Sequence, residues 1–395
     1  MTFFRLYNAK GTSNAIFMLR TMAERVIEKQ RDLYVCFIDY EKAFDKVKHE
    51  ELMEILRDIG VAGKEYRVIK NLYWAQKACV KINGEETGWQ AIRRGVRQGC
   101  VLSPDLFSLY GEIIMRGISD YEGIQIGGRN INNIRYADDT VLIAHSSQQL
   151  QLIFNRVKEE SERKGLNINI GKTKTMVLSK NSPAPRFQLW CGEQRVEQVE
   201  RFEYLGSIIT EDVRCKEEIN RRIMIAKAAF INMKNILTNR KLSIKTRKNL
   251  VKTYVWSTLL YGVESWTLSA ATINKLDAME MWCWRRMMKI PWTARITNET
   301  VLEMVREGRE LIRTVRGRQL RFFGHVMRRE GMENVIITGM VEGRRGRGRP
   351  REKYVDGLVK LMGDGMTHLR LIRATSDREQ WKSMVADVME DMAQR

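Results

Sequence analysis

Hydrophobic positions in the first half of the chain recur with two periods, which predict a mixture of helices and strands. Apolar residues at helical spacing predict helices over 11–31, 41–60, 63–75, 103–118 and 147–164. Short apolar runs and turn residues predict a buried strand over 33–39, a hairpin joining 80–84 to 88–95 through Asn83-Gly84, a second hairpin over 134–144, and a strand pair near 166–179.

The pattern changes near residue 212, where amphipathic helical segments replace the strands. Helices are predicted over 215–237, 244–262 and 269–290, and we expect their Trp and Met side chains to form a core rather than to bind a cofactor. Beyond 295 the chain is rich in arginine, and the stretch EGRRGRGRPREK at 342–353 has a composition that does not form a packed core. A final helical segment follows it. The sequence therefore divides at about residues 211 and 292.

Charge points to a polyanionic partner, while the cysteines exclude two other classes of protein. The formal net charge of +20 favours nucleic acid, although a basic surface without such a partner remains an alternative. The six cysteines include no Cys-X-X-Cys pair and there are only four histidines, which argues against a zinc finger or a disulfide scaffold. No apolar run reaches the roughly 18 residues of a membrane span. The sequence shows no secretory signal, so we expect an intracellular protein that does not associate with membranes.

Two adjacent carboxylates, Asp138 and Asp139, interrupt the apolar hairpin IRYADDTVLIA at 134–144. One interpretation is a tight turn, in which Asp is common, and the other is a site for a hard divalent cation. A third carboxylate, Asp39, ends the apolar strand at 33–39, where a charge is costly. If the two segments are neighbours in one sheet, the three groups meet at one edge. Three carboxylates there suit two Mg²⁺ ions about 4 Å apart, as nucleotidyl transfer requires.

Five sequence blocks in a fixed order resemble the reverse transcriptases of non-LTR retrotransposons. FIDYEKAFDKV (37–47), RRGVRQGCVLSPDLF (93–107) and YADD (136–139) are similar to palm motifs A, B and C, GLNINIGKTK (165–174) to motif D, and FEYLGSII (202–209) to the primer grip. The resemblance covers roughly residues 8–215 and continues loosely to the end of the chain.

The resemblance implies an α+β fold and an RNA-directed DNA polymerase. It implies a right-hand polymerase palm with partial fingers over 1–211, a helical thumb over 212–292 and a basic, mostly helical C-terminal region over 293–395. The implied partners are an RNA template, a DNA primer, dNTPs and, for such elements, genomic target DNA. The implied cofactor is Mg²⁺, with Mn²⁺ as a substitute.

Site residues follow from the same resemblance. It assigns Asp39, Asp138 and Asp139 as the catalytic metal ligands. Phe44, five residues after Asp39, would lie under the incoming sugar and exclude a 2′-hydroxyl, although it also suits a helix core. Lys172 would donate a proton to pyrophosphate or contact a phosphate.

The remaining assigned residues would bind substrate. Gln98 and Gly99 would line the nucleotide pocket, with Gly99 allowing close backbone approach. Arg94, together with Arg97, would contact template or triphosphate, and Tyr136 of the YADD block would lie at the substrate. Two further residues of the same blocks are Lys174 and Asp45. Lys174 competes with Lys172 for its role, and Asp45 fits a helix start better than a metal ligand.

Other stretches of the chain support further expectations. GLNINIGKT is not a phosphate-binding P-loop, because Gly165 and Gly171 enclose five residues where that motif needs four. Basic residues of the thumb, among them Arg221, Arg222, Lys227 and Lys234, suit either a duplex backbone or an ordinary solvated face. The resemblance begins near NAKGTSNAIFMLR, so we expect shortened fingers. The alternative to a polymerase is therefore a catalytically inactive remnant that only binds nucleic acid. The segment 343–351 suits nucleic-acid binding or nuclear targeting, with the nucleus as the predicted site of action and the cytoplasm as the alternative.

Overall fold

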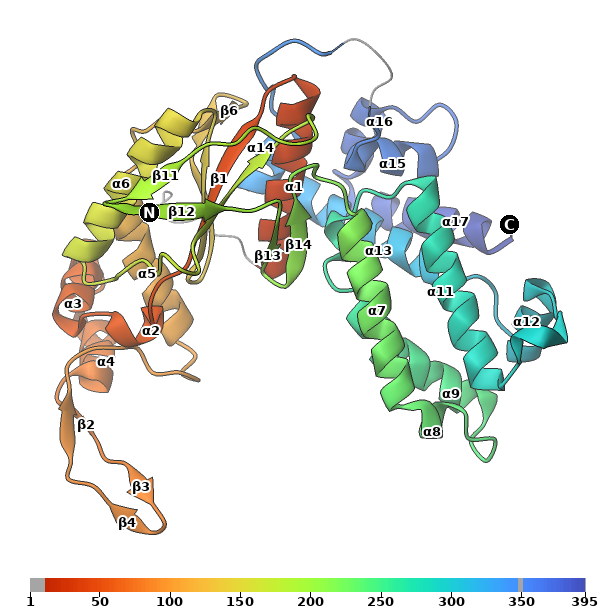
Figure 1. The fold of residues 1–395 in the computed structure, drawn as a ribbon, viewed down its shortest axis with the longest axis horizontal. Helices are drawn as coiled ribbons and strands as arrows, with labels where there is room; N and C mark the ends of the chain where they lie inside the picture. The colour runs from red at the N-terminus through yellow and green to blue at the C-terminus, as the bar shows by residue number, and fades with distance from the viewer. Residues whose placement is uncertain (1–10, 347–350, 395) are drawn as a thin grey trace. The chain divides into compact units, whose positions relative to one another are not determined.

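The chain forms two compact units that interleave along the sequence. The computed structural model describes residues 11–346 and 351–394, so part of the Arg/Gly-rich segment lies outside the described residues (Figure 1). The first unit comprises 11–15, 29–202 and 340–344, and the second comprises 16–28, 203–339, 345–346 and 351–394. The three functional regions bounded at 211 and 292 remain a prediction.

The first unit is built on a six-stranded sheet. Its strands, in spatial order, are β11 (Leu189–Cys191), β12 (Gln194–Gln198), β10 (Lys174–Leu178), β1 (Leu33–Ile38), β9 (Asp139–Ala144) and β8 (Asn133–Tyr136). Strand β1 pairs antiparallel with both β9 and β10, and its side chains are buried on both faces of the sheet, which explains why it reads as a continuous apolar run. The predicted buried strand and the predicted hairpin over 134–144 are therefore confirmed, and they are direct neighbours.

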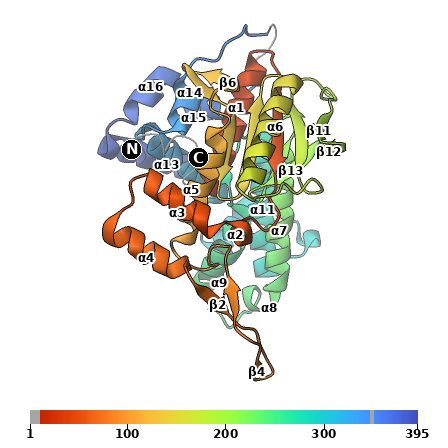
Figure 2. The same cartoon turned by 90° about the vertical axis from the view of Figure 1, so that its left-hand side faces the viewer.

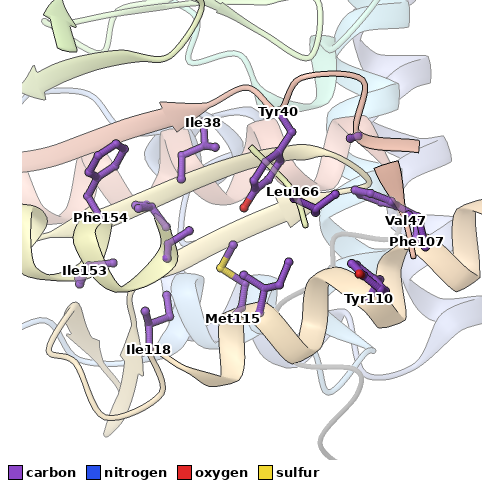
Figure 3. Close-up of a cluster of buried hydrophobic side chains, with 14 of the residues drawn as sticks. Ile38, Tyr40, Val47, Phe107, Tyr110, Met115, Ile118, Ile153, Phe154 and Leu166 are labelled. Carbon is purple, nitrogen blue, oxygen red and sulfur yellow. The ribbon is translucent and has the colours of Figure 1, made fainter. Parts of the chain in front are cut away.

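Two long helices cover the sheet and form the core of this unit. Helix α6 (Ser147–Arg163) packs on β1 and β9, and α5 (Ser103–Arg116) packs on α6. Their apolar faces meet in the cluster drawn in Figure 3, which includes Phe107 and Phe154. Helix α6 begins where Ser146 accepts a hydrogen bond from the backbone of Gln149, the side-chain cap that serine commonly supplies. The sheet edge that carries the carboxylates thus rests on a fixed helical layer.

The single helix expected over 41–60 is wrong. The structure has a short helix α2 (Ala43–Lys46), an extended break, and α3 (His49–Asp58). The break exists because a distant segment binds this backbone: Gly95 N–H donates to the Val47 carbonyl and Val96 N–H to the Phe44 carbonyl, each at 2.8 Å. A local apolar period cannot reveal such a long-range partner. The break sets the position of α2 beside Asp39.

Two strand predictions also need correction. The turn at Asn83-Gly84 is right, but it joins only β3 (Lys81–Ile82) to β4 (Glu85–Glu86). Strand β5 (Gln90–Ile92) pairs instead with β2 (Gln76–Ala78), which follows α4 (Gly63–Tyr73), and β3–β4 extends beyond this pair (Figure 2). The strand pair near 166–179 is a loop followed by β10 alone, and a small hairpin, β6 (Ile124–Ile126) and β7 (Arg129–Ile131), was not predicted.

The second unit is helical apart from the hairpin of β13 (Arg201–Tyr204) and β14 (Ser207–Thr210). Its helices are α1 (Thr12–Glu28, from residue 16), α7 (Lys216–Asn232), α8 (Lys234–Leu237), α9 (Ile244–Leu250), a π-helical turn (Val251–Val255), α10 (Trp256–Leu259), α11 (Ala270–Met288), α12 (Asn298–Val305), α13 (Leu311–Met327), α14 (Met332–Thr338), α15 (Tyr354–Leu361), α16 (His368–Ala374) and α17 (Arg378–Gln394).

Apolar side chains of these helices meet in a core, as the periodicity predicts. Trp256, Trp284, Met279 and Met287 are all buried in one cluster between α7, α10 and α11. The expectation that Trp and Met build a core here is therefore confirmed. Within the described residues, none of the helices has the length and apolar character needed to cross a bilayer.

Candidate active site

Strand register places the three predicted metal-binding carboxylates at one edge of the sheet. The last pair of the β1–β9 ladder is Ile38 with Thr140, so one further step sets Asp39 opposite Asp139. In the β8–β9 hairpin Tyr136 pairs with Asp139, which leaves Ala137 and Asp138 as the two-residue turn. Ala137 adopts a φ of 54°, the left-handed conformation that tight hairpin turns use. The turn and the acidic site are therefore the same feature, and the two interpretations of this stretch are compatible.

Unbalanced negative charge collects at this edge. Burial, followed by the charges of Asp138 and Asp39, raises the pKa of Asp139 to about 6, even though this side chain keeps contact with solvent. Burial also raises the pKa of Asp138, with a further contribution from Asp39. The Lys172 Nζ lies 3.9 Å from Oδ2 of Asp39 in a solvent-exposed pair. Such a pair contributes little, so a bound cation would relieve the repulsion.

The backbone around Asp39 is held by the loop before β10. Asn169 N–H donates to the Asp39 carbonyl at 2.8 Å, and the Asp39 N–H donates to Thr173 Oγ1 at 3.2 Å. The same loop carries Lys172 towards Asp39. Lys174 instead lies in β10, and its Nζ pairs with Glu197 at 2.9 Å. This pairing favours Lys172 as the residue that donates a proton to pyrophosphate or contacts a phosphate.

A cavity of about 230 Å³ opens beside these groups. Five of the predicted site residues line it: Asp39, Phe44, Gln98, Asp138 and Lys172. The Phe44 ring is held against Phe107 in a stacked pair, with centroids 4.6 Å apart and planes at 19°. Phe44 is thus both a wall of the cavity and part of the core, as the sequence allowed.

Four of the predicted residues lie outside the lining of this cavity. Asp139 is across the ladder from Asp39, Tyr136 is half-buried before the turn, and Arg94 is an exposed residue that bridges to Lys48 through the backbone. Gly99 has a φ of 84° and open space where a side chain would start. Its predicted role of permitting close approach stays a prediction.

Sequence reasoning missed four lining residues, Tyr40, Lys42, Ala43 and Asp45. Lys42 sits at the start of α2 with a φ of 48°, and Asp45 lies in the first turn of that helix. Asp45 belongs to the block that resembles motif A, which could have indicated a place at the site. Its position at a helix start explained the residue equally well, so it was not predicted to line the cavity.

The described residues contain no three His, Cys, Asp or Glu groups that already converge as a metal site. The donor chemistry nevertheless fits a hard divalent cation, since the three neighbouring groups offer only carboxylate oxygens and two have raised pKa values.

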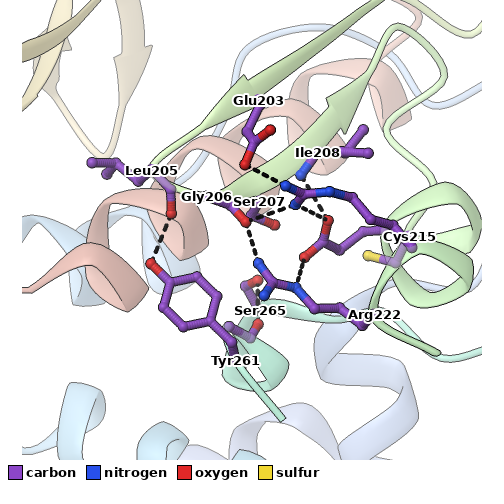
Figure 4. Close-up of polar contacts among 12 residues, drawn as sticks. Glu203, Leu205, Gly206, Ser207, Ile208, Cys215, Arg222, Tyr261 and Ser265 are labelled. Carbon is purple, nitrogen blue, oxygen red and sulfur yellow. Dashed lines mark hydrogen bonds and ion pairs between the residues drawn. The ribbon is translucent and has the colours of Figure 1, made fainter. Parts of the chain in front are cut away.

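In the second unit, the turn of the β13–β14 hairpin is clamped by polar contacts (Figure 4). Tyr261 donates its hydroxyl hydrogen to the Leu205 carbonyl at 2.8 Å, and Arg221 donates to the Gly206 carbonyl at 3.0 Å. Arg222 also donates to the Gly206 carbonyl and lies over the Tyr261 ring, 4.5 Å from its centroid.

Buried charges hold the strand that follows this turn. Glu218, fully buried, accepts hydrogen bonds from Ile208 N–H at 2.8 Å and from Arg222 Nε at 2.7 Å. Arg20 donates to the Ile208 carbonyl at 2.7 Å. The sequence suggested either a duplex contact or a solvated side chain for Arg222, and both suggestions are wrong. Arg222 is buried and supports the hairpin that resembles the primer grip.

Comparison with known proteins identifies the family. Residues 3–209 match the family model described as "Reverse transcriptase (RNA-dependent DNA polymerase)". The chain belongs to the reverse transcriptase family, whose members generally use divalent metal ions.

Its relatives come from mobile elements. The chain is 29% identical over 278 residues to a transposon-derived protein of Caenorhabditis elegans, covering 66% of this chain and 98% of that protein. It is 26% identical to the Pol polyprotein of the retrotransposable element R2 of Nasonia vitripennis, covering 51% of this chain and 20% of that one. It is 23% identical to the RNA-directed DNA polymerase of the mobile element jockey of Drosophila funebris, covering 74% of this chain and 32% of that one. The predicted non-LTR type of reverse transcriptase is confirmed by these relatives.

Among solved structures, apo telomerase of Candida tropicalis is similar with a TM-score of 0.41 at 13% identity, covering 85% of this chain and 57% of that one. The chain spans only 20% of the R2 polyprotein and 32% of the jockey polymerase.

Proposed function

We propose that this chain adds deoxynucleotides to a primer 3′-hydroxyl under the direction of an RNA template. The observation that carries the proposal is the β1–β9 register, which sets Asp39 opposite Asp139 beside the turn that holds the half-buried Asp138. Membership of the reverse transcriptase family gives this carboxylate edge a reaction. RNA template, DNA primer and dNTPs are the proposed substrates, with genomic DNA as the proposed target.

Asp39, Asp138 and Asp139 are the proposed ligands of Mg²⁺, with Mn²⁺ as a substitute. When bound, the metal supplies positive charge for the attacking hydroxyl and for the leaving pyrophosphate. The protein contributes a rigid edge, because a six-stranded sheet and its helical layer fix the three carboxylates. Burial, with a smaller contribution from neighbouring carboxylates, raises the pKa values of Asp138 and Asp139, and a bound divalent cation would favour their ionised forms.

The cavity walls are proposed to orient and select the nucleotide. Phe44 presents its ring to the cavity with little freedom, since Phe107 stacks against it, and a rigid ring there would collide with a 2′-hydroxyl. Gln98 and Lys172 line the same cavity and would contact the triphosphate. Lys172 is exposed and so can reach the leaving pyrophosphate to donate a proton. Arg94, Gly99 and Tyr136 would act on substrate from outside this lining.

Primer extension tests the proposal. The chain is incubated with a DNA primer annealed to RNA, with dNTPs and Mg²⁺, beside the double variant Asp138→Asn/Asp139→Asn. We expect extension by the wild type and none by the variant. Binding of primer-template by both proteins with extension by neither would reject the proposal and favour the binding-only remnant. We further propose the nucleus as the site of action, which localisation of a tagged chain would test.

A further inference from the structure

The second unit contains a cavity of about 1230 Å³ that is separate from the carboxylate edge. It is larger than the roughly 300–1,000 Å³ of sites for small ligands. One wall is a face of α11, on which Asn274, Ala278, Met281 and Arg285 follow at helical spacing, with Lys289 directly after the end of the helix. The other walls come from α8, from the segment before α12 and from the loop before α13. The dimensions suit part of a polymer.

Positive charge dominates the lining. Five cations line the cavity against the single carboxylate of Asp277: Lys234, Arg285, Arg286, Lys289 and Arg309.

These cations differ in how they are engaged. Arg285 is fixed by hydrogen bonds to the Ile296 carbonyl at 2.7 Å and to Asn298 Oδ1 at 2.9 Å, and Arg309 lies 3.8 Å from Asp277. Lys234, Arg286 and Lys289 have no acidic partner within the described part of the chain. Three cations are therefore available to an anion.

An aromatic platform accompanies these cations. The Trp282 ring lies in the lining, held at its edge by Phe230 with centroids 5.2 Å apart. The Arg286 guanidinium lies 5.3 Å from the ring centroid and the Lys227 ammonium 5.5 Å from it. Cations beside a partly exposed aromatic ring are the combination that single-stranded nucleic acids use, with phosphates on the cations and a base stacked on the ring.

We propose that this cavity is a binding site for single-stranded nucleic acid, read through its phosphates and one stacked base. The site does not depend on the polymerase activity, since none of its residues belongs to the carboxylate edge. An acidic peptide is a weaker candidate, because it offers charge to the cations but no planar group for Trp282.

Fluorescence anisotropy of the full chain with labelled oligouridine of about 15 nucleotides tests this site. The cavity variant is Lys234→Gln/Arg286→Gln/Lys289→Gln. The matched control, Lys360→Gln/Arg378→Gln/Lys382→Gln, removes three exposed charges from other helices of the same unit. We expect the cavity variant to bind at least about tenfold more weakly. Its slope of log K against log salt should be smaller by about 2, which is roughly 0.7 for each lost phosphate contact, while the control changes little.

Substitution of the tryptophan separates stacking from charge. Trp282→Leu should weaken binding about 5- to 150-fold without changing the salt slope, while Trp282→Phe retains most of the affinity. Circular dichroism confirms that each variant is folded. Equal losses in the cavity variant and its control would overturn the proposal. Polyglutamate of matched charge that displaces the labelled oligouridine as well as unlabelled oligouridine does would also overturn it. So would a cavity variant that loses more affinity for an RNA–DNA duplex than for the single strand.

Discussion

Replacing Arg222 with methionine should strongly destabilise the second unit. Arg222 is 8% exposed, and its guanidinium joins the buried Glu218 to the Gly206 carbonyl of the hairpin turn. Methionine keeps most of the aliphatic volume but removes the guanidinium. The buried Glu218 carboxylate then retains the hydrogen bond from Ile208 N–H at 2.8 Å and the longer contact with Arg221 Nη1 at 3.8 Å. Removing one partner of a buried ion pair costs about 3–5 kcal/mol. For a unit of this size that corresponds to a fall in melting temperature of about 6–20 °C.

Intrinsic fluorescence can follow this loss, because six of the nine tryptophans belong to the second unit, at positions 256, 266, 282, 284, 292 and 381. Thermal and urea unfolding are compared with Arg214→Met, an exposed arginine of the preceding loop, which should cost less than about 0.5 kcal/mol. Glu218→Gln/Arg222→Met removes both charges and should be more stable than Arg222→Met alone. A cost below about 1 kcal/mol for Arg222→Met, or no recovery in the double variant, would refute the buried-pair reasoning.

Two further predictions concern pH and nucleotide selection. Burial raises the pKa of Glu280 from 4.5 to about 7, so its stabilising contribution, complete below pH 4.5, is lost as the pH rises through about 7. In urea unfolding between pH 5 and 7 the wild type should therefore lose up to about 1.4 kcal/mol per pH unit more than Glu280→Gln, and equal slopes would contradict this. Phe44→Val should lower the preference for dNTP over NTP at least about tenfold in single-nucleotide addition. Phe107→Leu, which frees the Phe44 ring by removing its stacked partner but keeps the ring at the cavity, should lower the preference less than Phe44→Val does. An unchanged preference in Phe44→Val would exclude Phe44 as the residue that rejects a 2′-hydroxyl.

The carboxylate edge could be predicted from sequence because its determinants are local. An apolar run that ends in Asp39 predicts a strand, and an apolar stretch interrupted by Asp138 and Asp139 predicts a hairpin. Burying a charge costs free energy, so carboxylates within such apolar segments indicate a functional site. A shared site required the two strands to be neighbours in one sheet, a condition that the sequence left open and that the register of β1 and β9 meets.

The features that could not be predicted depend on contacts between distant segments. The break between α2 and α3 is made by backbone hydrogen bonds from Gly95 and Val96, and nothing in the apolar period of 41–60 indicates them. Likewise, the spacing of Glu218 and Arg222 on α7 fits a solvated helix face as well as a buried pair. Only the β13–β14 hairpin, which packs against α7, turns this pair inward.

The Mg²⁺ dependence of single-nucleotide addition in Asp39→Asn tests the central claim most directly. The matched control is Asp45→Asn, another carboxylate that lines the same cavity but is not a proposed metal ligand. The account predicts that the wild type and Asp45→Asn add the nucleotide with similar Mg²⁺ dependence, while Asp39→Asn is slower by at least about a hundredfold at saturating Mg²⁺. Wild-type rates for Asp39→Asn, or the same loss in both variants, would contradict the assignment of this edge as the catalytic centre.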